Sequence, residues 1–121
     1  MSHKVLFATA EPELVRQVTE ALEQAGYQVL SALDGTQALA CAAAEQPDLA
    51  CLDLDMPGAS GLEVCERLKA ERPMTVLITA EFLDDRTSAG FARAGADDLV
   101  FKPFTMDEIV DKVAWYLSPE D

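Results

Sequence analysis

A carboxylate, a hydroxyl and an ammonium group lie where three predicted strands end: Asp53, Thr79 and Lys102. A carboxylate can act as the nucleophile toward a phosphoryl donor. The hydroxyl can then donate a hydrogen bond to a phosphoryl oxygen, and the ammonium group can balance the added negative charge. If the three groups meet at one rim, they form a site for a phosphoryl group on Asp53. A structural ion pair between Asp53 and Lys102, beside a strand-favouring Thr79, explains the same residues.

Short apolar runs of strand length alternate with stretches in which apolar residues recur every three or four positions. This alternation is typical of a parallel sheet with helices on its faces. The expected strands cover residues 5–8, 27–33, 48–53, 74–79 and 99–101. Capping boxes predict helix starts at Ser60-Gly61-Leu62-Glu63 and at Thr105 with Glu108, and a fourth helix is expected over about residues 83–94.

The expected architecture is a single α/β domain over residues 1–121, with a five-stranded parallel sheet of order 2-1-3-4-5 and helices on both faces. Right-handed crossover connections allow this order. Ligands of such sheets bind beyond the carboxyl ends of the strands, where the strand order reverses. The order therefore brings together the ends of strands one, three, four and five, which are Thr9-Ala10-Glu11, Asp53-Leu54-Asp55, Thr79 and Lys102.

The composition is strongly acidic, with 22 acidic and 9 basic residues and a formal net charge of −13. Nucleic acids and anionic membranes bind to basic faces, so neither is an expected partner of this domain. The N-terminus lacks the basic-then-apolar layout of a signal peptide, and a cytoplasmic location is expected. Cys41, Cys51 and Cys65 lie in apolar runs, which predicts reduced residues of the core.

Several stretches together resemble the response-regulator receiver domains of two-component signalling, over essentially the whole chain. These stretches are Pro47–Leu49, Leu52–Gly58, Ser60–Glu63, Ile78–Glu81, Ala94–Asp98 and Phe101–Phe104. Each stretch is weak alone, but all occur in order and at the family's spacing. The resemblance implies a three-layer flavodoxin-like (βα)5 fold. It also implies that Asp53 is the phosphoacceptor, Thr79 the switch hydroxyl and Lys102 the phosphate-contacting base, with a cis bond before Pro103.

The family resemblance also implies partners. A sensor histidine kinase or a phosphotransfer protein would supply the phosphoryl group, and a downstream protein or an effector domain of the same protein would receive the signal. The face formed by the fourth helix, the fifth strand and the last helix is the family's usual partner face, which makes a homodimer through it one expectation. Trp115 falls off the buried stripe of the last helix and is a candidate anchor there.

Two positions depart from the family pattern. Receivers normally carry two adjacent acids that hold Mg²⁺ at the end of the first strand, but Thr9 and Ala10 stand there in this chain. Mg²⁺ prefers carboxylate oxygens, so only Asp53 and Asp55 are left as ligands and its binding is expected to be weak or absent. Leu99 stands where many members carry an aromatic ring that moves on activation, so the sequence does not by this route predict the usual coupling from Thr79 to the last helices, although the family resemblance still implies signalling through the face of the fourth helix, fifth strand and last helix.

Other functions fit parts of the sequence. A pseudo-receiver would use the same fold as a phosphorylation-independent interaction module. Phosphatases of the haloacid dehalogenase type carry a pair like Asp53 and Asp55, but on their first strand and with a later acidic motif that is absent here. A flavodoxin would need a loop that cradles phosphate, and Ala8-Thr9-Ala10-Glu11-Pro12 lacks its Gly and hydroxyls. The protein is therefore not expected to be an enzyme.

Overall fold

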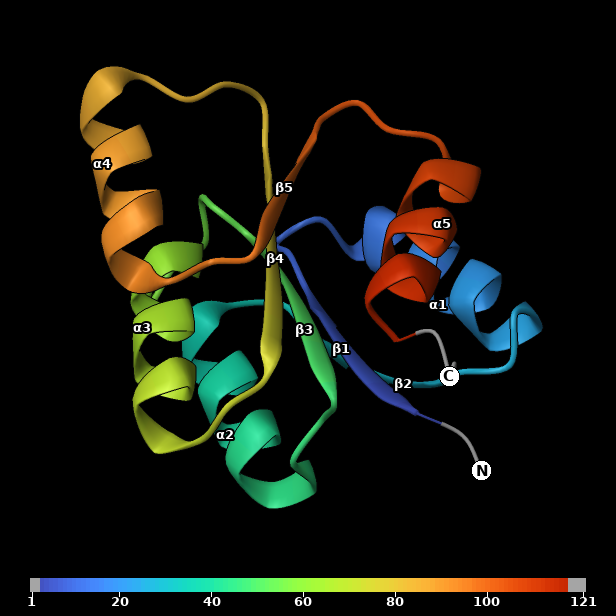
Figure 1. The fold of residues 1–121 in the computed structure, drawn as a ribbon. Coiled ribbons are helices and arrows are strands. Elements are labelled where there is room, and N and C mark those ends of the chain that lie inside the picture. Colours follow the sequence, from blue (N-terminus) through green and yellow to red (C-terminus); the bar gives the residue numbers. More distant parts are fainter. Residues whose placement is uncertain (1–2, 118–121) are drawn as a thin grey trace.

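Five strands and five helices alternate along residues 3–117, the part of the chain that the computed structural model describes (Figure 1). The strands are β1 (Lys4–Ala8), β2 (Gln28–Ala32), β3 (Leu49–Asp53), β4 (Thr75–Ala80) and β5 (Asp98–Phe101). The helices are α1 (Pro12–Gln24), α2 (Gly35–Glu45), α3 (Gly61–Glu71), α4 (Asp85–Ala94) and α5 (Met106–Tyr116). The predicted alternation of strands and helices is confirmed.

All strands pair in parallel, in the predicted order β2-β1-β3-β4-β5. The central strand β3 is buried along its whole length, as expected for a parallel strand covered on both faces. The register places Asp53 opposite Thr79 and Leu52 opposite Ala8. The carboxyl ends of β1, β3 and β4 therefore lie next to one another.

Helices cover both faces of the sheet and make three layers (Figure 1). Helices α1 and α5 lie on one face, while α2, α3 and α4 lie on the other (Figure 1). Successive strand residues point to opposite faces, so each strand contributes to two separate cores. Leu52 packs in the core beneath α2, α3 and α4. Its neighbour Cys51 packs in the core beneath α1 and α5.

The predicted helix starts are confirmed with one correction. Both capping boxes form, at Ser60 with Glu63 and at Thr105 with Glu108. Helix α4 begins at Asp85 and not near residue 83, because the Asp84 side chain accepts a 2.7 Å hydrogen bond from the Thr87 N–H and caps the helix there. The bond between Lys102 and Pro103 is cis, as the family resemblance implied.

The cysteines lie in or near the cores and form no disulfide. Cys51 and Cys65 are buried, and Cys41 is half-buried. Burial raises the pKa of the Cys65 thiol to about 11, so that this side chain is a neutral thiol at physiological pH. Within residues 3–117, none of the helices has the length and apolar character needed to cross a bilayer.

Candidate functional site

Asp53 ends β3 and is almost completely buried, with 5% of its surface exposed. Thr79, directly opposite it on β4, donates a hydrogen bond of 3.1 Å from Oγ1 to Asp53 Oδ1. Lys102, just beyond β5, approaches Asp53 Oδ2 with its Nζ at 3.2 Å. The structure thus brings the carboxylate, hydroxyl and ammonium group together at one rim.

The turn that follows Asp53 is held at both sides. The Leu54 N–H donates to the Thr79 carbonyl at 2.8 Å and so extends the pairing of β3 with β4 beyond the strand. Gly61, at the start of α3, lies so close that a Cβ there would come within 2.4 Å of the Asp53 carbonyl oxygen. The backbone of Asp53 is therefore fixed by β4 on one side and by α3 on the other.

Lys102 lies between two carboxylates. Its Nζ contacts Glu11 as well as Asp53, and 14% of its side chain is exposed. Burial by itself would lower the pKa of Lys102, but the hydrogen bond to Glu11 and the nearby charge of Asp53 outweigh it and raise the pKa above its ordinary value. Lys102 consequently stays cationic at physiological pH.

Thr9 was expected at this rim as the replacement of a metal-binding acid, and its hydroxyl had no predicted role. The residue is fully buried, and its Oγ1 donates to Asp53 Oδ2 over 2.9 Å. An ionised carboxylate can only accept hydrogen bonds, so the Thr9 hydroxyl must be the donor. The sequence did contain a signal for this role, because Thr9 follows directly after β1. Polar residues at the carboxyl ends of parallel strands gather at one rim, and this rule selects Thr9 as well as Asp53 and Thr79.

The remaining sequence candidates lie outside this cluster. Ala10 is exposed. Asp55 is also exposed, has no described hydrogen bond to Asp53, and lines a hollow of about 190 Å³ together with Glu81 and Asp84. A second hollow of about 360 Å³ opens beside Lys102 and Glu11.

The donor set at Asp53 fits Mg²⁺ poorly. Within residues 3–117, no group of three or more His, Cys, Asp or Glu side chains is arranged to hold a metal ion. Asp53 Oδ2 receives a hydroxyl from Thr9 and an ammonium group from Lys102, where a metal would need the lone pairs of oxygen ligands. The negative charge of the Asp53 carboxylate is already balanced by Lys102 and by the hydrogen bonds from Thr9 and Thr79.

Comparison with known proteins gives a consistent result. Residues 5–114 match the family described as "Response regulator receiver domain". The alkaline phosphatase synthesis transcriptional regulatory protein PhoP of Bacillus subtilis is 34% identical over 93% of this chain and 48% of its own length. The transcriptional regulatory protein KdpE of Mycobacterium tuberculosis is 37% identical over 90% of this chain and 48% of its own length. The chain thus spans about half the length of these relatives.

Solved structures show the same fold. The response regulator DrrB of Thermotoga maritima, an OmpR/PhoB homologue, is 30% identical and superposes with a TM-score of 0.87 over 97% of this chain and 53% of its own. A CheY-like receiver domain protein of Methanospirillum hungatei superposes with a TM-score of 0.92 at 24% identity, over 97% of this chain and 94% of its own. The family match over residues 5–114, together with the relatives at 34% and 37% identity, shows that the chain belongs to the response regulator receiver domain family of two-component signalling.

Proposed function

We propose that this receiver domain accepts a phosphoryl group on Asp53 and passes the signal on through its surface. One observation carries the proposal: Thr79 Oγ1 and Lys102 Nζ both lie within hydrogen-bonding distance of the Asp53 carboxylate, at 3.1 and 3.2 Å. A hydroxyl and an ammonium group in these places can bind the oxygens of a phosphoryl group carried by that carboxylate.

In the proposed reaction an Asp53 oxygen attacks the phosphorus atom of the donor. A phosphorus–oxygen bond to Asp53 forms while the bond to the donor's leaving atom breaks, and the leaving group takes that electron pair. Lys102 contacts a transferred oxygen and balances its charge, and Thr79 donates a hydrogen bond to another. Mg²⁺ is proposed to bind weakly or not at all, because Thr9 and Ala10 stand in place of carboxylates.

The donor is proposed to be a sensor histidine kinase or a phosphotransfer protein, the donors of the receiver family. The chain matches about half of relatives that are named transcriptional regulators. We therefore propose that the signal passes to a downstream protein or to an effector domain of the same protein. The domain by itself is not expected to bind nucleic acid, because its formal net charge is −13.

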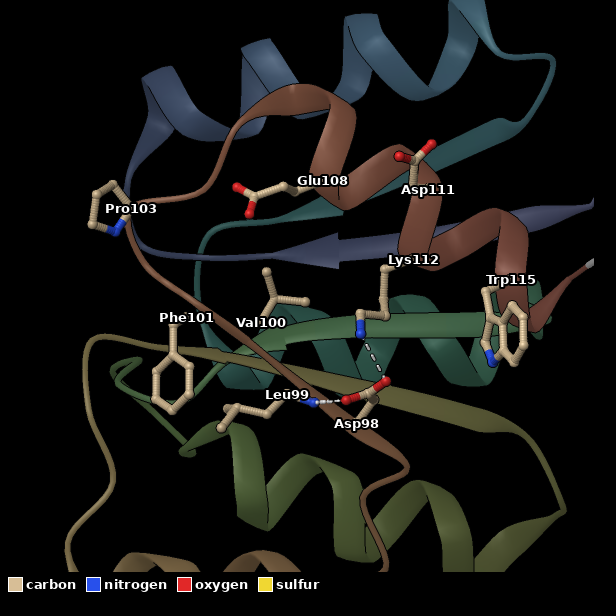
Figure 2. Close-up of a pocket in the computed structure, with 9 residues that line it drawn as sticks. All are labelled: Asp98, Leu99, Val100, Phe101, Pro103, Glu108, Asp111, Lys112 and Trp115. Carbon is tan, nitrogen blue, oxygen red and sulfur yellow. Dashed lines mark hydrogen bonds and ion pairs between the residues drawn. The ribbon is translucent and has the colours of Figure 1, made fainter.

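The proposed output surface is formed by α4, β5 and α5. A groove of about 650 Å³ lies beside β5 and α5. Figure 2 shows Trp115 and Phe101 among the residues that line it. Trp115 is 76% exposed and Phe101 is 55% exposed, although both are large apolar side chains. Asp111 also lines the groove and has no ion pair among residues 3–117. An apolar partner surface with basic residues would complement this groove.

The same charge argument bears on a homodimer through this face. Each copy would carry a formal net charge of −13 over its whole chain, and like net charges oppose association. We propose that a different protein occupies the face. Analytical ultracentrifugation at low and high salt tests this proposal, because a dimer at low salt that Trp115→Ala abolishes would contradict it.

Phosphoryl acceptance is tested by incubating the chain with acetyl phosphate, with Mg²⁺ or with a chelator, and measuring the intact mass. The expected result is a mass gain of one phosphoryl group that is absent in Asp53→Asn. Asp55→Asn is the matched control and should still be labelled, because Asp55 is exposed and lies outside the hydrogen-bonded cluster. The absence of a mass gain under every condition would instead select a phosphorylation-independent interaction module.

The relatives are named as transcriptional regulators and not as enzymes. We propose that this chain likewise does not turn over a phosphate-ester substrate. The pair Asp53 and Asp55 lies at the end of β3 and not of β1, unlike that of the phosphatases considered above. Hydrolysis of a generic phosphate ester that Asp55→Asn abolishes would contradict this proposal.

A further inference from the structure

The Asp53 carboxylate is satisfied by three donors from three different strand ends. Thr9 Oγ1 lies 2.9 Å from Oδ2, Lys102 Nζ lies 3.2 Å from the same oxygen, and Thr79 Oγ1 lies 3.1 Å from Oδ1. A buried carboxylate is costly unless it is paired and hydrogen-bonded. These donors supply the pairing, so the folded site needs no further cation.

The Thr9 hydroxyl points its hydrogen atom at Asp53 Oδ2. A metal ligand at this position would instead have to direct an oxygen lone pair at the ion. Its hydroxyl is fully buried between Asp53 Oδ2 and the Glu11 N–H, which approaches Oγ1 at 3.4 Å. Rotating the hydroxyl toward a metal ion would remove the hydrogen bond to Asp53. A divalent ion at Asp53 would therefore have to displace a donor that the fold holds in place.

Lys102 carries the positive charge of the site. Its Nζ contacts both Glu11 and Asp53, which come from the ends of β1 and β3. A divalent ion bound to Asp53 would lie beside this ammonium group, and like charges at such short range repel strongly where solvent is largely excluded. Asp55 is exposed and lines a separate hollow, so its carboxylate does not offset that repulsion at Asp53.

We propose that the ammonium group of Lys102 is the resident cation of this site, and that Thr9 is the residue that keeps divalent ions away from Asp53. The inference extends the weak Mg²⁺ binding proposed above, but it concerns ion binding and is measurable without phosphorylation. It assigns Thr9 a positioning role: the hydroxyl orients Asp53 and determines which cation the carboxylate meets.

The test replaces Thr9 and measures binding of Mg²⁺ by calorimetry and by its effect on the Tm. Thr9→Asp places a second carboxylate beside Asp53, which should lower the Tm without metal and allow Mg²⁺ to restore it. Its Mg²⁺ affinity should be at least tenfold that of the unchanged chain. Thr9→Val is the matched control. It lacks the hydroxyl and adds no metal ligand, so its Mg²⁺ affinity should rise much less than that of Thr9→Asp.

A second variant keeps the test decisive if Thr9→Asp does not fold. Lys102→Met removes the ammonium group but keeps the apolar stem of the side chain. Asp53 and Glu11 then lack their shared cation, and Mg²⁺ should raise the Tm of this variant while leaving that of the unchanged chain within error. Adding Asp53→Asn to either variant should abolish the gain, which locates the ion at Asp53.

The inference is overturned if the unchanged chain binds Mg²⁺ as tightly as Thr9→Asp does, or if a folded variant gains no affinity. This outcome differs from a failure of the proposed function. Mass labelling at Asp53 together with tight Mg²⁺ binding by the unchanged chain would support phosphoryl acceptance and contradict the role of Thr9. If the ion titrations give the expected result but Asp53 is not labelled, the role of Thr9 is supported and phosphoryl acceptance is contradicted.

Discussion

The hydroxyl of Thr9 and the carboxylate of Asp53, 44 positions apart in the sequence, form a buried hydrogen bond of 2.9 Å that joins the ends of β1 and β3. The bond occupies the part of the site where receivers usually hold a metal through two acids. A receiver that substitutes one of those acids by Thr thus gains a hydrogen-bond donor for its central carboxylate as it loses a metal ligand.

Removing this hydrogen bond should destabilise the fold. Thr9→Val keeps the shape of the side chain but leaves Asp53 with one donor fewer, and loss of a partner from a buried polar group costs about 1–3 kcal/mol. Urea unfolding measures the change in the free energy of unfolding. Thr19→Val is the matched control, because the buried Thr19 Oγ1 has no hydrogen-bond partner among the described residues. Equal losses in both variants would contradict the argument.

Gly61 should be required for the geometry of the site. In Gly61→Ala the new Cβ would meet the Asp53 carbonyl oxygen at 2.4 Å, and a backbone atom cannot move aside cheaply. We expect a loss of stability of about 2 kcal/mol or more, typical of overpacked sites, and slower labelling of Asp53. Gly90→Ala is the control, since its Cβ would meet only the tip of Leu62 at 3.3 Å. A Gly61→Ala variant with unchanged stability would show that α3 can shift.

The acid sensitivity of the fold should depend on Asp98, which joins β5 to α5. Its carboxylate accepts from the Leu99 N–H at 2.7 Å, from Tyr116 at 2.9 Å and from Lys112 at 3.0 Å (Figure 2 shows the first and third). Burial raises the pKa of Asp98, but these hydrogen bonds and the charge of Lys112 outweigh it and lower the pKa below its ordinary value of 3.8.

A carboxyl group whose pKa is lowered on folding stabilises the fold above its unfolded pKa. That stabilisation is complete above about pH 4 and is lost as the pH falls through the lower, folded value. Asp98→Asn should therefore lower stability at neutral pH by about 1.5–3 kcal/mol and flatten the acid limb of a plot of stability against pH. Asp111→Asn is the control, because Asp111 has no ion pair among residues 3–117. An unchanged acid limb in Asp98→Asn would refute the assignment.

Thiol labelling should distinguish the three cysteines. Burial raises the pKa of all three thiols, but Cys51 and Cys65 are buried whereas Cys41 is half-buried and therefore open to a reagent. At neutral pH a thiol reagent should modify Cys41 first, and all three thiols should react only after unfolding in urea. Mass spectrometry of the native and unfolded protein counts the modified sites. Rapid modification of Cys51 in the native protein would contradict the predicted core.

The fold could be predicted from local patterns. Apolar runs and helical periodicity identified the five strands and their alternation with helices, because burial imposes one spacing on strands and another on helices. Hydrogen-bonding side chains located the starts of α3 and α5. The start of α4 was predicted too early, because a pattern of apolar residues does not show that Asp84 turns back to cap the Thr87 N–H.

Spacing and chain connectivity were enough to predict the architecture and to select Asp53, Thr79 and Lys102, since they define the strand ends and the order of a parallel sheet. The hydrogen-bond partners of these groups could not be predicted in this way and are known from the three-dimensional packing. Register brought Thr9 against Asp53, and the path after β5 brought Lys102 between Asp53 and Glu11. Such contacts depend on side-chain directions across elements distant in the sequence, where a shift of a few ångströms separates a hydrogen bond from no interaction.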